Sequence, residues 1–252
     1  VAAPVMTEAD RFFDEYARAA ALMDSNARQQ AAVVMDQLYR SLSTTPWLEI
    51  ALLKHAELSE ALHPTIALEE YDLLQKRLAN APYFQTSRQR SQLFGTALQS
   101  AADRGISRIR LQRVRDGLGR YFARYMQYPE TLAKLAIFNY VDDRDILDPN
   151  NRPFRYLPTG MQLRPTITYL RYELESIPAE PFFVTSPKII GTSQVGEGEN
   201  AKYVCLVRVP SKPEPVRVTE DQTLEGYYIA AIAARGAVLT GGNRVLVLPV
   251  PK

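Results

Sequence analysis

The sequence predicts an α+β fold in three successive parts. Apolar residues recur at helical spacing through residues 7–127, whereas residues 186–250 are a series of short apolar runs typical of β-strands. Between these regions, closely spaced prolines interrupt any long helix. We therefore expect a helical bundle in residues 1–108, a stem helix with a proline-rich strand segment in 109–180, and a small β-barrel or meander in 181–252.

The composition is that of an ordinary globular protein. Of the 252 residues, 46% are hydrophobic and 23% are charged, and the formal net charge is +2, so the overall charge favours neither nucleic acid nor an acidic partner. The one cysteine, Cys205, excludes an internal disulfide, and the apolar run around it predicts a buried, unreactive thiol. No stretch approaches the roughly 20 apolar residues of a membrane helix. The chain opens at Val1 without methionine, and we expect an N-terminal piece to have been removed.

Five or six amphipathic helices are expected in the first half of the chain. The clearest apolar stripe, with spacing i, i+3, i+4, i+7 and i+11, comprises Ala31, Val34, Met35, Leu38 and Leu42. Thr45-Pro46 suits the start of the next helix, and Pro64 opens another. Stripes that begin near Leu93 and Leu111 predict a fifth and a sixth helix. No repeat with a period near 34 residues is found, which favours a bundle over a repeat array.

Strands are expected after Pro149. Residues Thr166–Glu175 alternate well enough for a strand, and the pair Gly241-Gly242 predicts a tight hairpin. Further short apolar runs are Tyr203–Val209, Val216–Val218, Tyr227–Ile232, Ala237–Leu239 and Arg244–Val250. Several short strands of this kind close most simply as a meander or a small barrel.

No motif predicts catalysis or a cofactor. His55 falls on an apolar helix stripe and His63 at a helix end, so both are interpreted as structural residues. No grouping of serine, histidine and acid stands out. The glycine-rich segments 191–198 and 240–242 match no nucleotide-binding fingerprint and are interpreted as turns. We therefore expect a protein that is not an enzyme.

Two charged clusters have an alternative interpretation each. The loop VDDRDILDP carries four aspartates, Asp142, Asp143, Asp145 and Asp148, whose oxygens are suitable ligands for calcium. The residue spacing of an EF-hand is missing, so carboxylates that face solvent are the favoured interpretation. Seven arginines between residues 104 and 124 could follow a polyanion, although a basic, solvated helix face is the simpler interpretation.

The segment 128–176 reads YPETLAKL, then ILDPNNRPFRYLPTG, then YLRYELES. It resembles the part of type II secretion pseudopilins that follows their long N-terminal helix. The positions that match the pattern of that family are Tyr128, Pro129, Leu132, Asp148, Pro149, Pro153, Tyr156, Tyr172, Leu174 and Ser176. Asn150 and Asn151 stand where the family has Trp-Gly, and Phe154 replaces a tyrosine. The resemblance implies that helix 109–127 is a pilin-like stem, although the hydrophobic membrane half of such a stem is absent.

The segment 188–250 looks like the periplasmic homology region of the C-type inner-membrane component of type II secretion systems, a β-module that the pilus-assembly lipoprotein P also carries. The positions that carry this resemblance are Ile189, Ile190, Gly191, Val218, Asp221, Leu224, Gly226, Ile232, Val238, Leu239, Gly242, Val245, Val247 and Leu248.

Together the resemblances imply a non-enzymatic scaffold component of a type II secretion or type IV pilus-like machine, in the periplasm or cell envelope. Its expected partner is an envelope assembly protein such as a secretin's periplasmic domain, which would add a strand to an exposed edge. By resemblance, the partner-binding residues are Ile189, Ile190, Gly191, Thr192, Val204, Cys205, Leu206 and Val207. The alternative is a helical adaptor that binds a peptide or protein in a groove of residues 7–127.

Overall fold

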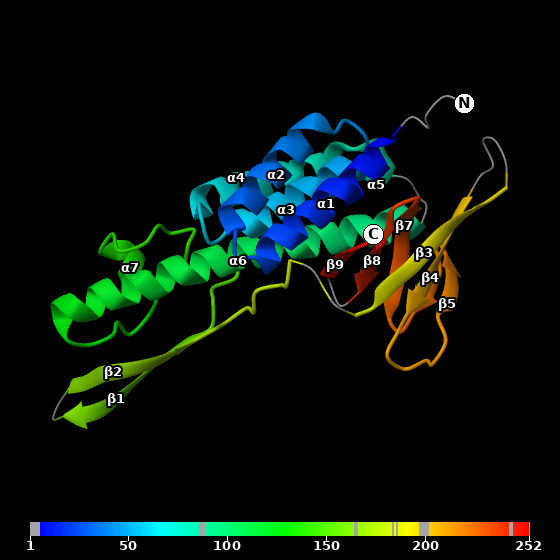
Figure 1. Cartoon of the computed structure of the whole chain (residues 1–252). Coiled ribbons are helices and arrows are strands. Elements are labelled where there is room, and N and C mark those ends of the chain that lie inside the picture. The colour runs from blue at the N-terminus through cyan, green and yellow to red at the C-terminus, as the bar shows by residue number, and fades with distance from the viewer. Residues whose placement is uncertain are drawn as a thin grey trace. The chain divides into compact units, whose positions relative to one another are not determined.

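The predicted α+β class is confirmed. A computed structural model describes residues 6–85, 89–163, 166–182, 184, 186–196, 202–241 and 244–251. Helices fill the N-terminal part, and small antiparallel sheets fill the C-terminal part (Figure 1). Within the described ranges, no helix combines the length and the apolar character that crossing a bilayer requires.

The chain packs into two compact units. Unit 1 joins residues 1–102 to residues 180–252, and unit 2 consists of residues 103–179. The boundaries expected from the sequence fall at 108 and 180. Unit 1 is thus built from both ends of the described chain, with unit 2 inserted between them.

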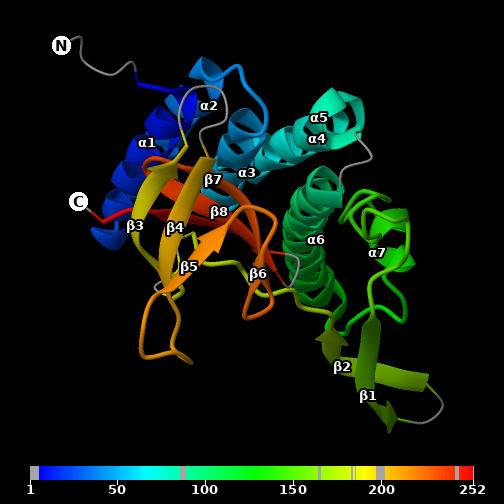
Figure 2. The ribbon, with the colours of Figure 1, turned by 90° about the vertical axis from the view of Figure 1, so that its right-hand side faces the viewer.

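The helical part of unit 1 is formed by consecutive helices that pack on one another (Figure 2). They are α1 (Glu8–Asp24), α2 (Arg28–Ser41), α3 (Trp47–Ser59), α4 (Pro64–Asn80), the short α5 (Pro82–Gln85) and the first part of α6 (Gln89–Tyr125). Thr7 begins α1 with a capping box, in which its hydroxyl accepts the Asp10 N–H and the Asp10 carboxylate accepts the Thr7 N–H. Helix α3 is the most buried of them, since ten of its thirteen residues are buried.

The expectation of separate fifth and sixth helices was wrong. The stripes near Leu93 and Leu111 belong to one 37-residue helix, α6. No proline separates the two stripes, and Gly105 inside a helix costs only about 1 kcal/mol relative to alanine. Packing of both stripes outweighs that cost.

The C-terminal β-module, residues 186–251, contains two antiparallel meanders. One sheet has the order β3-β4-β5 and the other β6-β7-β8-β9. The strands are β3 (Lys188–Val195), β4 (Lys202–Arg208), β5 (Val216–Thr219), β6 (Thr223–Leu224), β7 (Tyr227–Ala233), β8 (Gly236–Gly241) and β9 (Arg244–Pro249). No ladder joins the two sheets among the described residues, so the module is a pair of stacked meanders and not a closed barrel.

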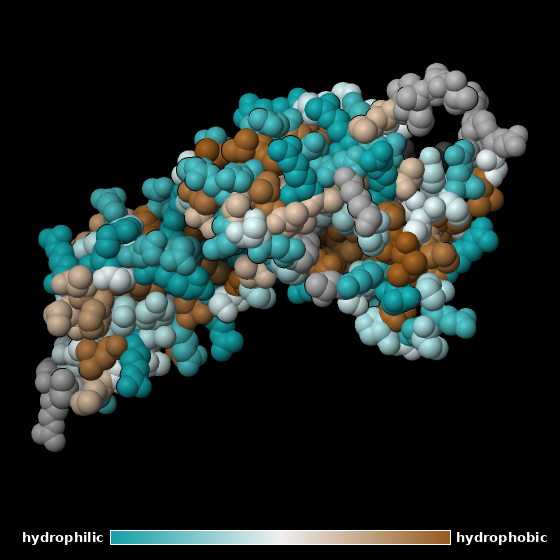
Figure 3. Space-filling model, in the orientation of Figure 1, coloured by the Kyte–Doolittle hydropathy of each residue, from teal (hydrophilic) through white to brown (hydrophobic). Residues whose placement is uncertain are grey.

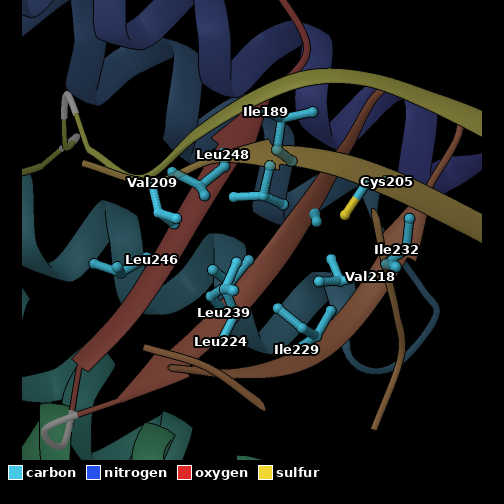
Figure 4. Close-up of a cluster of buried hydrophobic side chains, with 12 residues drawn as sticks. Ile189, Cys205, Val209, Val218, Leu224, Ile229, Ile232, Leu239, Leu246 and Leu248 are labelled. Atoms are coloured by element: carbon cyan, nitrogen blue, oxygen red, sulfur yellow. The ribbon is translucent and has the colours of Figure 1, made fainter. Parts of the chain in front are cut away.

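One apolar core holds these two sheets together. Ile189 and Cys205 from the first sheet point toward Leu239 and Leu248 from the second (Figure 4). The predicted hairpin is confirmed by the pairing of Gly241 with Arg244; Gly242 lies outside the described residues.

Helix α1 attaches the β-module to the helices of unit 1. The Tyr16 ring stacks on Phe182 with ring centroids 5.0 Å apart, and its hydroxyl donates to the Phe182 carbonyl oxygen. Phe13 lies against Gly236, where an added Cβ would come within 2.4 Å of the ring. Asp14 forms an ion pair with Arg235. The aromatic face of α1 therefore packs directly on the module and on the segment that leads into it.

Unit 2 combines the second part of α6 with the short α7 (Ala133–Ile137) and a β-hairpin, β1 (Tyr156–Leu163) and β2 (Thr166–Leu174). The predicted strand at Thr166–Glu175 is confirmed as β2. Strand β1 was not predicted, because Pro158 and Gly160 interrupt its pattern. Gly160 is required there: a Cβ at this position would lie 2.0 Å from the Thr168 carbonyl oxygen, beside a bulge in the ladder.

The connection between α2 and α3 is held by one carboxylate. Glu8 accepts hydrogen bonds from the N–H and hydroxyl groups of Ser43 and Thr44, including 2.8 Å from the Thr44 nitrogen and 2.7 Å from the Ser43 hydroxyl. The Thr44 hydroxyl first, and then the Ser43 hydroxyl, lower the pKa of Glu8 from 4.5 to about 2.

Replacing Glu8 with glutamine is expected to cost about 1 kcal/mol at pH 7, the usual value of an exposed capping side chain. Because the folded pKa is depressed, this stabilisation is present above pH 4.5 and is lost as the pH falls toward about 2. Urea unfolding of the wild type and the variant between pH 7 and pH 2 measures the difference. Glu69→Gln, on an exposed position of α4, is the control. If the difference in the free energy of unfolding between the wild type and Glu8→Gln stays constant down to pH 2, the proposed pH dependence is contradicted.

Candidate functional site

Strand β3 carries half of the predicted partner-binding residues and lies at the edge of its sheet. Its one hydrogen-bonded neighbour among the described strands is β4. Ile189 is buried in the module core, whereas Ile190 is 41% exposed and is the extra residue of a bulge. Gly191 has open space where a Cβ would stand. The Thr192 hydroxyl donates to the Ala234 carbonyl oxygen.

The expectation that Val204–Val207 also form an exposed edge was wrong. These residues belong to β4, which is hydrogen-bonded to β3 on one side and to β5 on the other. Val204, Cys205 and Val207 are buried, and Leu206 alone of the four is exposed. Proline at Val204 would therefore break the central strand and is not a clean test of docking.

The Cys205 thiol is inert, as its sequence context suggests. It is buried in the module core, and desolvation raises its pKa from 9.0 to about 12. The reactive thiolate is therefore not formed at physiological pH.

An apolar groove of about 430 Å³ opens beside the start of β3. Its floor is α1, where Tyr16, Ala17 and Ala20 face it, and its walls come from the beginning of β3 and the end of β9. The lining from the β-module consists of Val184, Pro187, Lys188, Ile189, Val247, Leu248, Pro249, Val250 and Pro251. Figure 3 shows apolar side chains gathered over this part of the module. Lys188 is the charged residue among this lining.

The small residues of α1 explain why the groove exists. Tyr16 is fully buried against Phe182. Ala17 and Ala20 on the same helix have small side chains, so the space that larger side chains would fill stays open as the groove. Pro249 ends β9 opposite Gly236, and Pro251, which has no N–H to donate, follows it, so the chain leaves the sheet beside α1. The sequence indicated Ile189 alone of these residues, because the others meet only through the packing of α1 on the module.

A buried row of polar side chains between α3 and α4 was missed by the sequence analysis. His55 Nδ1 lies 2.7 Å from a Glu70 oxygen, and the Ser59 hydroxyl lies 3.5 Å from His55 Nε2. All three are less than 9% exposed, and none lines a described pocket. The His55–Glu70 contact in this row joins α3 to α4.

Two of the four aspartates of the loop 142–148 hold the loop in place. Asp145 forms an ion pair with Arg113 at 3.2 Å. Asp148 accepts the N–H groups of Asn150 and Arg152 at 2.9 and 2.8 Å. In the described part of the chain, no cluster of three or more His, Cys, Asp or Glu residues is placed to hold a metal.

Most of the α6 arginines fasten later segments of unit 2 to the helix. Their guanidinium groups donate to carbonyl oxygens: Arg108 to Pro178, Arg110 to Leu147, Arg115 to Glu175 and Arg120 to Tyr140. Because these donors have partners inside the protein, fewer arginines are available to bind a polyanion than the sequence suggests.

Comparisons of the chain with protein-family models, with curated proteins and with solved structures find no match.

Proposed function

We propose that this protein is a non-enzymatic docking component of an assembly, and that it binds an extended segment of a partner protein at the β3 edge. One observation carries the proposal: an edge strand, unpaired on its outer side by any described strand, borders an apolar groove that is closed from below by α1. An edge strand offers unpaired N–H and C=O groups to an added strand, and a neighbouring groove accepts its alternate side chains.

The chemistry of the groove defines the segment that it accepts. Alanine, valine, isoleucine and proline side chains line it, so aliphatic or aromatic residues of the partner gain most by entering. Lys188 at the first position of β3 favours an acidic residue next to them. The expected ligand is therefore a short extended peptide with apolar residues at alternate positions and one carboxylate.

The resemblance of segments 128–176 and 188–250 to type II secretion and type IV pilus components supports a cell-envelope setting. On this proposal, the partner is an envelope assembly protein such as a secretin's periplasmic domain. Two tyrosines that carry the resemblance have local roles compatible with it: Tyr156 donates to the Pro129 carbonyl oxygen at 2.7 Å, and the Tyr128 N–H donates to the Tyr169 carbonyl oxygen at 2.6 Å.

Filling the groove with Ala20→Trp is expected to lower capture of the partner by at least about tenfold, because the indole occupies the space of the incoming side chains. Ala21→Trp is the matched control, since Ala21 is the exposed neighbour on α1. The measurement is a pull-down from envelope extract with identification by mass spectrometry. A photoreactive residue at the exposed rim position 188, compared with position 21, then maps the contact without filling the groove.

An envelope assembly protein that is captured by the wild type and Ala21→Trp, is lost with Ala20→Trp and is cross-linked from position 188 supports the proposal. Equal capture by both tryptophan variants would contradict it. Deletion of residues 181–252 is a poorer test, because it also removes the surface on which α1 packs.

A further inference from the structure

The two faces of the β1-β2 hairpin differ sharply. On the inner face, Tyr156, Tyr172 and Leu174 pack against the apolar core of unit 2. The ladder pairs Leu157 with Glu173 and Thr159 with Arg171, and these residues make up the outer face. All four are exposed.

The outer face is apolar for a solvent-facing surface. Leu157 is 49% exposed, Leu170 at the bulge is 46% exposed, and Met161 is 60% exposed. The inner face packs on α6 and stabilises the two-stranded hairpin, so the exposed apolar residues of the outer face are not needed to hold the hairpin in unit 2. Contiguous exposed apolar side chains on such a ribbon mark an interaction surface.

Two opposite charges lie between these apolar residues. Arg171 and Glu173 are two residues apart on β2, so their side chains project from the same face. Neither takes part in an ion pair within the described part of the chain. When a second copy is related to the first by a two-fold rotation, the cation of each copy can face the anion of the other. The surface is then complementary to itself.

We propose that the outer face of the hairpin binds the same face of a second copy of this chain. A two-fold axis across β2 near Tyr172 places Arg171 of each copy opposite Glu173 of the other. Such an interface is isologous, so one pair of residues supplies two ion pairs. Leu157 and Leu170 flank the charges and lose their exposed surface in the dimer. A purely apolar partner would leave Arg171 and Glu173 without opposite charges. A second copy supplies one opposite charge for each of them, so charge complementarity favours a second copy.

The test is the mass of the whole chain in solution, measured by sedimentation velocity over a concentration series. The wild type is expected to dimerise. Arg171→Glu alone and Glu173→Arg alone each place like charges opposite one another, and each is expected to weaken the dimer by about tenfold or more. The double variant, with both changes, restores opposite charges and is expected to regain most of the wild-type affinity.

One control and one further variant test whether the effect is specific to this face. Arg28→Glu reverses an exposed charge on α2 in unit 1 and is expected to leave the dimer unchanged. Leu170→Glu is expected to give a monomer whose circular dichroism and melting temperature match the wild type, since Leu170 lies outside the unit 2 core. A monomeric wild type at about 100 μM would overturn the proposal and leave this face to a different partner. A dimer that the single charge reversals do not weaken, or that the double variant does not restore, would overturn it as well.

Discussion

Replacing Tyr16 with alanine is expected to lower the free energy of unfolding by about 3–5 kcal/mol, the range for removing a fully buried aromatic side chain. The ring contacts Phe12 and Phe182 and is inaccessible to solvent. Its loss leaves a cavity where α1 meets the β-module. Because that contact joins the two ends of the described chain, the loss affects the helices and the sheets of unit 1 together.

The matched variant Tyr16→Phe separates the ring from the hydroxyl. It retains the stacking and removes the hydrogen bond to the Phe182 carbonyl oxygen, which is expected to cost about 1 kcal/mol. Urea unfolding followed by circular dichroism for the helices and by near-ultraviolet signals for the aromatic contacts measures both variants. A loss below about 1 kcal/mol for the alanine variant would contradict a stabilising contact between α1 and the β-module.

Replacing Arg77 with alanine is expected to destabilise the protein by about 3 kcal/mol, because it leaves a buried carboxylate without its cation. Glu49 in α3 is fully buried, and both Arg77 Nε and Nη2 donate to its Oε1, at 3.0 and 2.8 Å. The other oxygen, Oε2, has no partner within the described part of the chain. Arg77 is thus the main compensation for this charge.

The double replacement Glu49→Met with Arg77→Met is expected to recover most of that loss, since a buried ion pair is often no more stabilising than apolar residues of similar volume. Arg40→Ala is the control: Arg40 pairs with Asp36 at the surface, and its loss is expected to leave the free energy of unfolding nearly unchanged. Urea unfolding of the four proteins measures the loss in the free energy of unfolding and its recovery in the double variant. A double variant as unstable as Arg77→Ala alone would contradict this account.

The features that depend on local patterns could be predicted from the sequence. The stripe through Val34 and Leu38 forms the buried face of α2, and β2 and the β8-β9 hairpin appear where alternation and glycine indicated them. The burial of Cys205 also follows from its neighbours along the chain. In each case the periodicity of the side chains within one element determines which face is covered.

The features that depend on which elements meet could not be predicted. Strand alternation is the same for a central and an edge strand, so Val204 was assigned to an edge although β4 lies between two neighbours. The row of Ser59, His55 and Glu70 exists because α4 folds back on α3. The groove requires Ala20 of α1 to approach Val247 of β9, and no pattern along the chain encodes that approach.

The hydrogen bond from Tyr16 to Phe182 spans 166 residues of chain, and this separation has a consequence for biosynthesis. At the usual rate of about 5–20 residues per second, the ribosome needs roughly 8–30 seconds to add the partner of Tyr16 after the tyrosine itself is made. Until Phe182 is made, Tyr16 lacks its stacking partner, although Phe12 and Phe13 can already pack on Trp47. Unit 2 is a continuous segment that is complete at residue 179. Unit 2 can therefore fold as it emerges, whereas unit 1 becomes stable only after the last strands have been synthesised.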